Sequence, residues 1–333
     1  MKTLAALSLG ALLTMAISAS PPLSHIATDS MPTSVTGRFD HLEADPAGNR
    51  LFLAAESAHE VLIFNLRTGA YERALGGIGI PHAIFVRDDL HRVYITDGGT
   101  GALRIYDGRS YKLLQTVPLK VDADSIGYDP GSHDLYIDNG GGDAHEAFSM
   151  FSAVNTETGA KDWEIQIPGD TLEAMAVART QPLVYVNNRA RNQVAVVNRG
   201  THAVVASWPI TKSKVNVAMA LDEAHHRLFV GCREGAIVVL DTASGRELQA
   251  LPIPTGADDL RFDGSNQRIY AATGSGNGEV TVYQEATPDR YTALGAVASG
   301  PGGKNETLAA GRLYVTIPPA KATPGRVLVF RAQ

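Results

Sequence analysis

The chain is short of cysteine and of clustered positive charge. Its 333 residues include one cysteine, Cys232, so neither an intrachain disulfide nor a Cys-x-x-Cys zinc site can form. Lysine and arginine number 29 against 35 aspartates and glutamates, and no basic run occurs, so nucleic acid is not expected as a partner. Because 44% of the residues are hydrophobic, the chain can still bury a sizeable core, which excludes a disordered or collagen-like protein.

Local catalytic motifs are also missing. The sequence contains no Gly-x-Ser-x-Gly, no His-Glu-x-x-His and no Walker or dinucleotide-binding glycine loop ahead of a helix. The glycine-rich stretch Gly274 to Gly278 lies between two apolar runs, and we expect it to be a hairpin loop rather than a phosphate loop. No enzyme class is therefore indicated by a local motif.

The first twenty residues have the pattern of a secretory signal peptide. Met1 and Lys2 form a short positive segment, the apolar run Leu4 to Ile17 follows, and Ala19 lies among small residues suited to cleavage. We expect a signal peptide over residues 1–19, a mature domain over residues 20–333, and a periplasmic or secreted location. The alternative is an uncleaved N-terminal anchor. No second long apolar run follows, so the mature chain is not expected to insert into a membrane.

A short phrase, in which an aromatic residue stands between two apolar residues, recurs along the whole chain. Successive aromatic positions are 41 to 49 residues apart, which is the period of a four-stranded propeller blade. The seven copies are Leu51 to Leu53, Val93 to Ile95, Leu135 to Ile137, Val184 to Val186, Leu228 to Val230, Ile269 to Ala271 and Leu313 to Val315. The sequence therefore predicts an all-β, seven-bladed beta-propeller.

Each copy reads as four strands separated by turns, which we call A to D from the channel outwards, but the last copy is incomplete. After its third strand, Val327 to Phe330, only three residues follow. The segment His25 to Thr36 precedes the first blade just as each fourth strand precedes the next blade. We expect this segment to supply the missing strand of blade seven and to cover an exposed sheet edge. A disordered tail is the alternative.

Several copies resemble the YVTN-type beta-propeller repeat. The resemblance rests on Leu135 to Asn139, on Val184 to Asn188, and on Gly79 to His82, which matches the Gly-x-Pro-His phrase of that repeat. It covers nearly all of the chain beyond the apolar N-terminal run, and the layout is similar to the exported YncE-like branch. Other copies depart from the pattern, with Leu53 to Ala55 and Val230 to Cys232 where Val-Thr-Asn would stand. The resemblance implies a scaffold more than an activity.

Polar residues open the strands that should line the central channel. Apolar or small residues would suffice there, so a ring of imidazoles, carboxylates and amides is the best candidate for a ligand-binding site. The B-to-C loops add arginines on the same face. The candidate residues are His41, His82, Asp124, Glu173, Asn216, Asp258, Asp259, Asn305, Glu306, Arg189 and Arg233.

Two interpretations of this ring remain open. Carboxylates and imidazoles that converge can bind a divalent metal ion, the one cofactor that the sequence suggests. The candidate ligands are His41, His82, Asp124, Glu173 and Asp258. Alternatively, these side chains hydrogen-bond to loop backbone and channel water. By contrast, His91, His133, His225 and His226 fall in turns between the first two strands, and we interpret them as solvated turn residues rather than a metal cluster.

These patterns favour an exported, YncE-like module that binds a small molecule or a periplasmic protein partner through its channel mouth. A metal-dependent lactonase-like hydrolase is one alternative, because Glu173, Asn216 and Asp258 resemble the Glu/Asn/Asp set of calcium-dependent lactonases. Such enzymes commonly have six blades, which counts against it. An accessory subunit of a periplasmic redox enzyme is another alternative.

Overall fold

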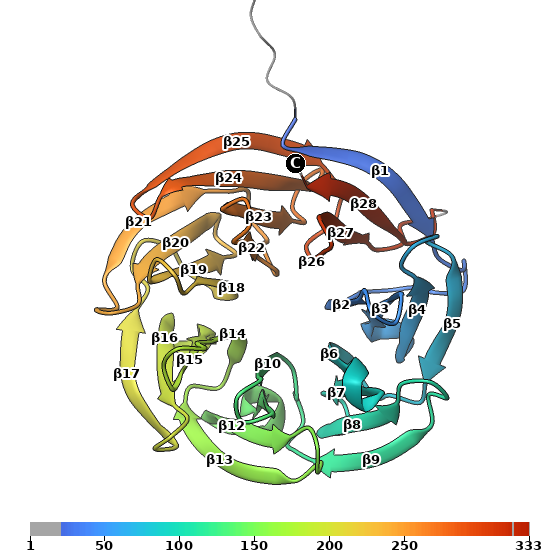
Figure 1. Cartoon of the computed structure of the whole chain (residues 1–333), viewed down its shortest axis with the longest axis horizontal. Helices are drawn as coiled ribbons and strands as arrows, with labels where there is room; N and C mark the ends of the chain where they lie inside the picture. The colour runs from blue at the N-terminus through green and yellow to red at the C-terminus, as the bar shows by residue number, and fades with distance from the viewer. Residues whose placement is uncertain (1–20, 322, 333) are drawn as a thin grey trace, which may run out of the picture.

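Seven sheets stand around a central channel in the computed structural model, which describes residues 21–321 and 323–332 (Figure 1). Each sheet has four strands, and each strand is antiparallel to its neighbours. The first strand of each blade lies at the channel and the last lies on the rim. The predicted seven-bladed beta-propeller is thus confirmed.

The blades follow one another along the chain. Blade one comprises β2 (Leu42–Asp45), β3 (Arg50–Ala55), β4 (Glu60–Asn65) and β5 (Tyr71–Gly76). Blade two comprises β6 (Pro81–Arg87), β7 (Arg92–Asp97), β8 (Ala102–Asp107) and β9 (Leu113–Pro118). Blade three comprises β10 (Ile126–Asp129), β11 (Asp134–Gly140), β12 (Phe148–Asn155) and β13 (Lys161–Pro168). Blade four comprises β14 (Leu172–Val177), β15 (Leu183–Asn188), β16 (Gln193–Asn198) and β17 (Ala203–Pro209).

The remaining blades repeat this plan. Blade five comprises β18 (Asn216–Asp222), β19 (Arg227–Cys232), β20 (Ala236–Asp241) and β21 (Glu247–Pro252). Blade six comprises β22 (Arg261–Asp263), β23 (Arg268–Thr273), β24 (Glu279–Thr287) and β25 (Arg290–Ala298). Blade seven comprises β26 (Glu306–Ala309), β27 (Arg312–Ile317), β28 (Arg326–Ala332) and β1 (Leu23–Ser30). Short 3₁₀ turns follow the second strands of blades one, three and four, at η1 (Glu56–Ala58), η3 (Gly141–Ala144) and η4 (Arg189–Arg191), and the first strand of blade two, at η2 (Asp88–Leu90).

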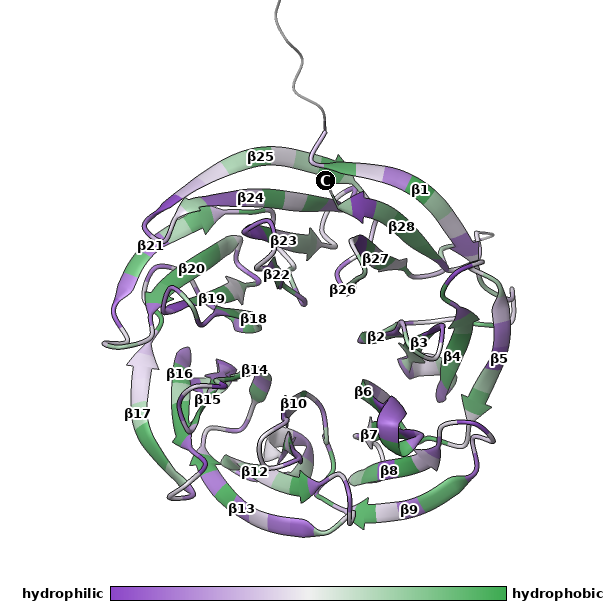
Figure 2. Cartoon of the chain, in the orientation of Figure 1, coloured by the Kyte–Doolittle hydropathy of each residue, from purple (hydrophilic) through white to green (hydrophobic). Residues whose placement is uncertain are grey.

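The core lies between blades rather than inside one sheet. The second and third strands are buried on both faces, which explains their nearly continuous apolar runs, whereas rim strands such as β5 and β9 are largely exposed. Apolar residues accordingly concentrate in the middle strands (Figure 2). Phe52 and Ile63 of blade one pack with Val93 and Ile95 of blade two, and comparable clusters join the other blades. This inter-blade packing is what the recurring aromatic phrase encodes.

The N-terminal segment closes the ring. Strand β1 pairs antiparallel with β28, from Leu23 opposite Ala332 to Ser30 opposite Arg326, and forms the fourth strand of blade seven. The predicted closure is confirmed, although the strand begins before His25 and ends before Thr36. The chain then continues toward β2 past Met31, whose side chain is buried. The edge of β28 is therefore covered by backbone hydrogen bonds.

The predicted signal peptide, residues 1–19, lies outside the described residues. Within the described part of the chain, no helix is long and apolar enough to cross a membrane.

Candidate functional site

A polar basin of about 320 Å³ lies at one mouth of the channel. The innermost strands converge there (Figure 1), and loops between second and third strands contribute Gly142, Arg189 and Arg233. Seven of the candidate site residues line this basin, and the other four, Asn216, Asp259, Asn305 and Glu306, do not. The structure thus brings together side chains from blades that are far apart in the sequence.

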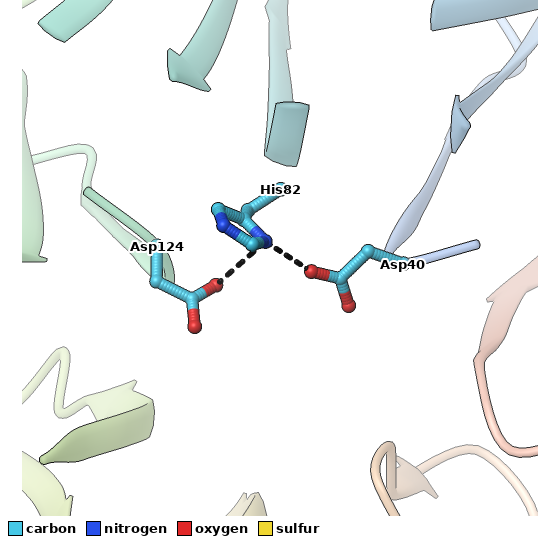
Figure 3. A group of neighbouring side chains, drawn as sticks. All are labelled: Asp40, His82 and Asp124. Carbon is cyan, nitrogen blue, oxygen red and sulfur yellow. Dashed lines mark hydrogen bonds and ion pairs between the residues drawn. The ribbon is translucent and has the colours of Figure 1, made fainter. Parts of the chain in front are cut away.

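The acidic side of the basin centres on His82, which lies between two carboxylates (Figure 3). Its Nδ1 is 2.6 Å from Asp40 Oδ2 and 3.9 Å from Asp124 Oδ1. One ligand atom from each of the three residues lies within 4.8 Å of the ligand atoms of the other two. Asp124 Oδ1 is buried and has no hydrogen-bond donor among the described residues. These three side chains, the Asp40–His82–Asp124 group, form a candidate metal site.

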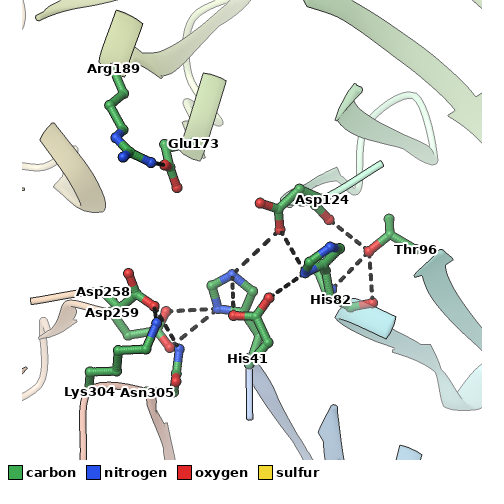
Figure 4. Close-up of polar contacts among 12 residues, drawn as sticks. His41, His82, Thr96, Asp124, Glu173, Arg189, Asp258, Asp259, Lys304 and Asn305 are labelled. Carbon is green, nitrogen blue, oxygen red and sulfur yellow. Dashed lines mark hydrogen bonds and ion pairs between the residues drawn. The ribbon is translucent and has the colours of Figure 1, made fainter. Parts of the chain in front are cut away.

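His41 adjoins this group from blade one (Figure 4). Its Nδ1 is 3.2 Å from Asp259 Oδ1, while its Nε2 is 3.8 Å from Asp40 Oδ1 and 4.0 Å from Asp124 Oδ1. Nε2 therefore points toward the same carboxylates that surround His82. The two imidazoles hold the acidic side of the basin together.

Burial and charge shift the pKa values of these groups strongly. Burial opposes the charge on His82, yet the carboxylates of Asp124 and Asp40 raise its pKa to about 10. The carboxylates of Asp259 and Asp40 likewise overcome burial and raise the pKa of His41 well above its usual value. Burial raises the pKa of Asp124 to about 7, while that of Asp40 is lowered, in spite of its burial, by His41 and His82. Both histidines are thus protonated in the metal-free group.

The other side of the basin uses permanently charged partners. Arg189 Nη1 lies 2.8 Å from Glu173 Oε1. Asp258 forms ion pairs with Arg233 and Lys304 and accepts a hydrogen bond of 3.3 Å from Asn305 Nδ2. Guanidinium groups do not lose their proton at accessible pH, so these carboxylates remain neutralised in place.

Negative charge exceeds positive charge in the basin as a whole. Its lining contains eight aspartate or glutamate side chains, four arginines or lysines, and two histidines. The excess gathers near Asp124: Asp122 and the deeper Asp138 have raised pKa values, each mainly because of burial and then because of neighbouring carboxylates. Such a surplus favours a bound cation.

The four predicted residues that do not line the basin are all buried. Asn216 Nδ2 donates to Asn187 Oδ1 at 2.8 Å and to the Gln193 carbonyl at 3.0 Å, which ties blade five to blade four. Glu306 is 0% exposed, and burial raises its pKa to about 8. The interpretation of these strand-opening residues as structural fits Asn216 best.

Sequence reasoning missed Asp40, Asp122 and Lys304. Each lies one or two residues before a position that was selected, because only the residues expected to open the inner strands, and those of the B-to-C loops, were considered. The signal was available: Asp40 precedes His41, and Asp122 precedes Asp124 by two residues, the spacing that returns a side chain to the same face of an extended segment.

Comparison with known proteins supports the fold alone. No family model matches the chain, and no curated protein matches it. A chain in the crystal structure of the Mitotic Checkpoint Complex has a TM-score of 0.76 at 13% identity, covering 99% of this chain and 98% of that one. The structure of U3-55K has a TM-score of 0.75 at 13% identity, covering 94% of this chain and 100% of that one. The chain is thus a seven-bladed beta-propeller that shares its overall fold with both of these structures.

Proposed function

We propose that this protein is an exported, YncE-like binding module whose channel mouth holds a divalent cation and, through it, an acidic ligand or protein partner. The observation that carries the proposal is the Asp40–His82–Asp124 group, in which an imidazole and two carboxylates present ligand atoms within 4.8 Å of one another. Asp124 Oδ1, which is buried and accepts no hydrogen bond from a described residue, adds to its support.

The chemistry of the group suits a first-row transition metal. Imidazole with carboxylate oxygen is a ligand set for Zn²⁺ or Mn²⁺, whereas Ca²⁺ prefers oxygen alone. His82 gives up its proton when an ion binds, since the ion replaces the proton as the partner of Asp40 and Asp124. His41 lies within 4.0 Å of Asp124 and stabilises the remaining negative charge.

Three protein ligands leave coordination positions open toward the basin. Arg38 lies at the rim, paired with Glu56 and with its side chain 77% exposed, and Arg233 and Lys304 also line the basin. A carboxylate or phosphate bound to the ion would therefore meet positive side chains around it. This arrangement supports an anionic small molecule or an acidic peptide segment of a periplasmic partner as the occupant.

Binding is proposed in preference to hydrolysis or a role beside a redox enzyme. The lactonase-like alternative requires Glu173 and Asp258 as available carboxylates, but each of them is paired with a guanidinium group. The solved structure of the Mitotic Checkpoint Complex places a similar propeller in a protein assembly, which agrees with a protein partner for this chain.

Calorimetric titration of chelator-treated protein with Zn²⁺ and Mn²⁺ tests the proposal. We expect Asp40→Asn and His82→Ala each to weaken binding at this site by 10-fold or more, in the range seen when ligands or their supports are removed. Glu72→Gln, which removes one exposed carboxylate from rim strand β5, serves as the matched control and should change nothing. Ion binding that is unaffected by both ligand variants would refute the proposed site.

The proposed location has its own test. Cell fractionation followed by N-terminal sequencing should recover the protein outside the cytoplasm without about its first twenty residues. A membrane-held protein that retains Met1 would contradict export as a cleaved, free module.

A further inference from the structure

A second cluster of ligand-type side chains lies at the opposite face of the ring, between blades five and six. Asp222 ends strand β18, whose first residue is near the basin, and His225 stands in the turn that follows. Glu285 belongs to β24 of the next blade. One ligand atom from each of these residues lies within 4.8 Å of the others. The cluster thus joins two blades far from the channel mouth.

His225 lies in a turn, as predicted, but it is partly buried rather than fully solvated. Its side chain is only 35% exposed, and its Nδ1 lies 2.5 Å from Asp222 Oδ2. His91 and His226, by contrast, are exposed and adopt left-handed φ values of 50° and 57°, as expected of turn residues. His225 is open to solvent on one side and faces buried carboxylates on the other, so an ion can enter from this side.

The junction between blades three and four shows a different side chain at the position of Glu285. Asp129 ends strand β10 of blade three, and Arg199 of blade four reaches it with Nε 2.9 Å from Oδ2. Arg199 and Glu285 occupy equivalent positions in their blades. Arg199 directly follows Asn198, which pairs with the first residue of β15, and Glu285 directly follows Gln284, which pairs with the first residue of β23. Their backbone N–H groups also donate equivalent hydrogen bonds of 2.9 Å, from Arg199 to the Pro182 carbonyl before β15 and from Glu285 to the Gln267 carbonyl before β23.

Blades five and six therefore place a carboxylate where blades three and four place a guanidinium. Asp222 is 4% exposed and Glu285 is 1% exposed, so two acidic groups face each other out of water. A buried carboxylate pair is costly unless a proton or a cation is shared between its members. Burial, followed by the charge of Asp222, raises the pKa of Glu285 to about 7.

The surrounding side chains leave this need unmet. Glu285 Oε2 is buried without a hydrogen-bond donor among the described residues. Glu285 Oε1 lies 3.2 Å from the hydroxyl of Tyr291, whose single proton also faces the Pro288 carbonyl at 2.9 Å. The nearby Arg227 bonds instead to Asp241 and Asp289 and to backbone carbonyls. A buried carboxylate with one oxygen that accepts no hydrogen bond thus lies beside Asp222 and His225.

We infer that Asp222, His225 and Glu285 bind a divalent transition-metal ion of the Zn²⁺ or Mn²⁺ type that clamps blade five to blade six. One imidazole and two carboxylates supply the nitrogen and oxygen ligands that such ions accept. The ion takes the place of the positive charge that Arg199 provides between blades three and four. This site is independent of the proposed function, because it shares no residue with the basin.

A stoichiometry experiment separates the two sites. Full-length protein lacking its metal is titrated with Zn²⁺ at neutral pH, and bound ion is measured by elemental analysis after desalting. We expect two ions per wild-type chain and one ion in the Asp40→Asn/His82→Ala variant. Adding Glu285→Arg to that variant should remove the last ion, whereas adding Glu279→Gln, a change at the other end of β24, should not.

Glu285→Arg also provides a folded control, because it copies the Arg199 arrangement. Its melting temperature without metal should equal or exceed that of metal-free wild type, and the rise of several degrees that Zn²⁺ produces at this site should disappear. Equal ion content with and without Glu285→Arg would overturn the inference. The inference would also be overturned if the melting temperature depended on pH through Asp222 and Glu285 but did not change with any ion, because a proton shared between the two carboxylates would then explain their burial. If only the basin proposal fails, wild type binds one ion and loses it in Glu285→Arg.

Discussion

The two sides of the basin neutralise their carboxylates by different means. Glu173 and Asp258 are paired with arginine and lysine side chains, which keep their charge at any ordinary pH. Asp40 and Asp124 depend on histidine, whose proton can be exchanged for a metal ion. The comparison teaches that residue type alone does not define a metal ligand. A carboxylate becomes available to bind an ion where the neighbouring side chain can give up its proton, as histidine can and arginine cannot.

The largest effect should come from opening the ring that holds both sides in place. Removal of residues 1–30 deletes β1 and leaves β28 with an unpaired edge, and it exposes the core around the buried Leu23. We expect a loss of at least about 3 kcal/mol in the free energy of unfolding, or failure to fold.

The matched control is a chain that begins at residue 21, which keeps β1 whole. Thermal denaturation followed by circular dichroism compares the two. Equal melting temperatures for both truncated chains would show that β1 does not close the ring.

Neutralising one carboxylate on each side should shift stability in opposite directions in metal-free protein. Asp258→Asn leaves Arg233 and Lys304 without their counter-ion and should cost about 2 kcal/mol, which is below the value for a fully buried pair because both cations are about one-third exposed. Asp124→Asn removes a buried negative charge together with its repulsion with Asp40 and Asp138, so the free energy of unfolding of this variant above pH 7 should equal or exceed that of wild type.

Urea denaturation at pH 8 measures both variants. If Asp124→Asn is the more destabilised of the two, the surplus of negative charge that we assign to its side of the basin is incorrect. Asp143→Asn, an exposed carboxylate on the same rim, serves as the control for the substitution itself.

The pH dependence should also differ between the sides. The pKa of His82 is raised in the folded state from an ordinary value of 6.5 to about 10, so its contribution to stability is complete below pH 6.5 and is lost as the pH rises toward 10. Metal-free wild type should lose stability across this window, and His82→Gln should flatten the slope. Affinity for Zn²⁺ should rise across the same window, because fewer protons compete with the ion.

Asp258→Asn should leave the contribution of His82 to that slope unchanged, because the groups that mainly raise the pKa of His82 are Asp124 and Asp40. The measurement is the unfolding free energy from urea titrations at intervals between pH 6.5 and pH 10. An identical slope in wild type and His82→Gln would mean that His82 is not paired as described.

The fold could be predicted from the sequence because its signal is repeated. The period of the aromatic positions gives the blade, and the missing strand after Phe330 gives the closure. Periodicity also placed His41 and His82 at the channel, where the structure finds them. Each inference used many equivalent positions, so a single departure did not change the result.

Pairing among the site residues could not be predicted in the same way. Whether Glu173 meets Arg189 or a metal ion depends on rotamers and on the rotation of each blade about the channel, which a repeat pattern does not encode. Glu306 was expected at the channel mouth, but Lys304 lines the basin and Glu306 lies buried beyond it. Asp40 was missed because it precedes the strand-opening position.

Anomalous diffraction from crystals grown with Zn²⁺ or Mn²⁺ tests the central claim most directly. The account predicts an anomalous peak in the basin at about 2.0–2.2 Å from an imidazole nitrogen of His82 and from oxygens of Asp40 and Asp124. It also predicts that Glu173 and Asp258 keep their arginine and lysine partners in the same crystal. An empty basin, or an ion seated on Glu173 and Asp258, would contradict it.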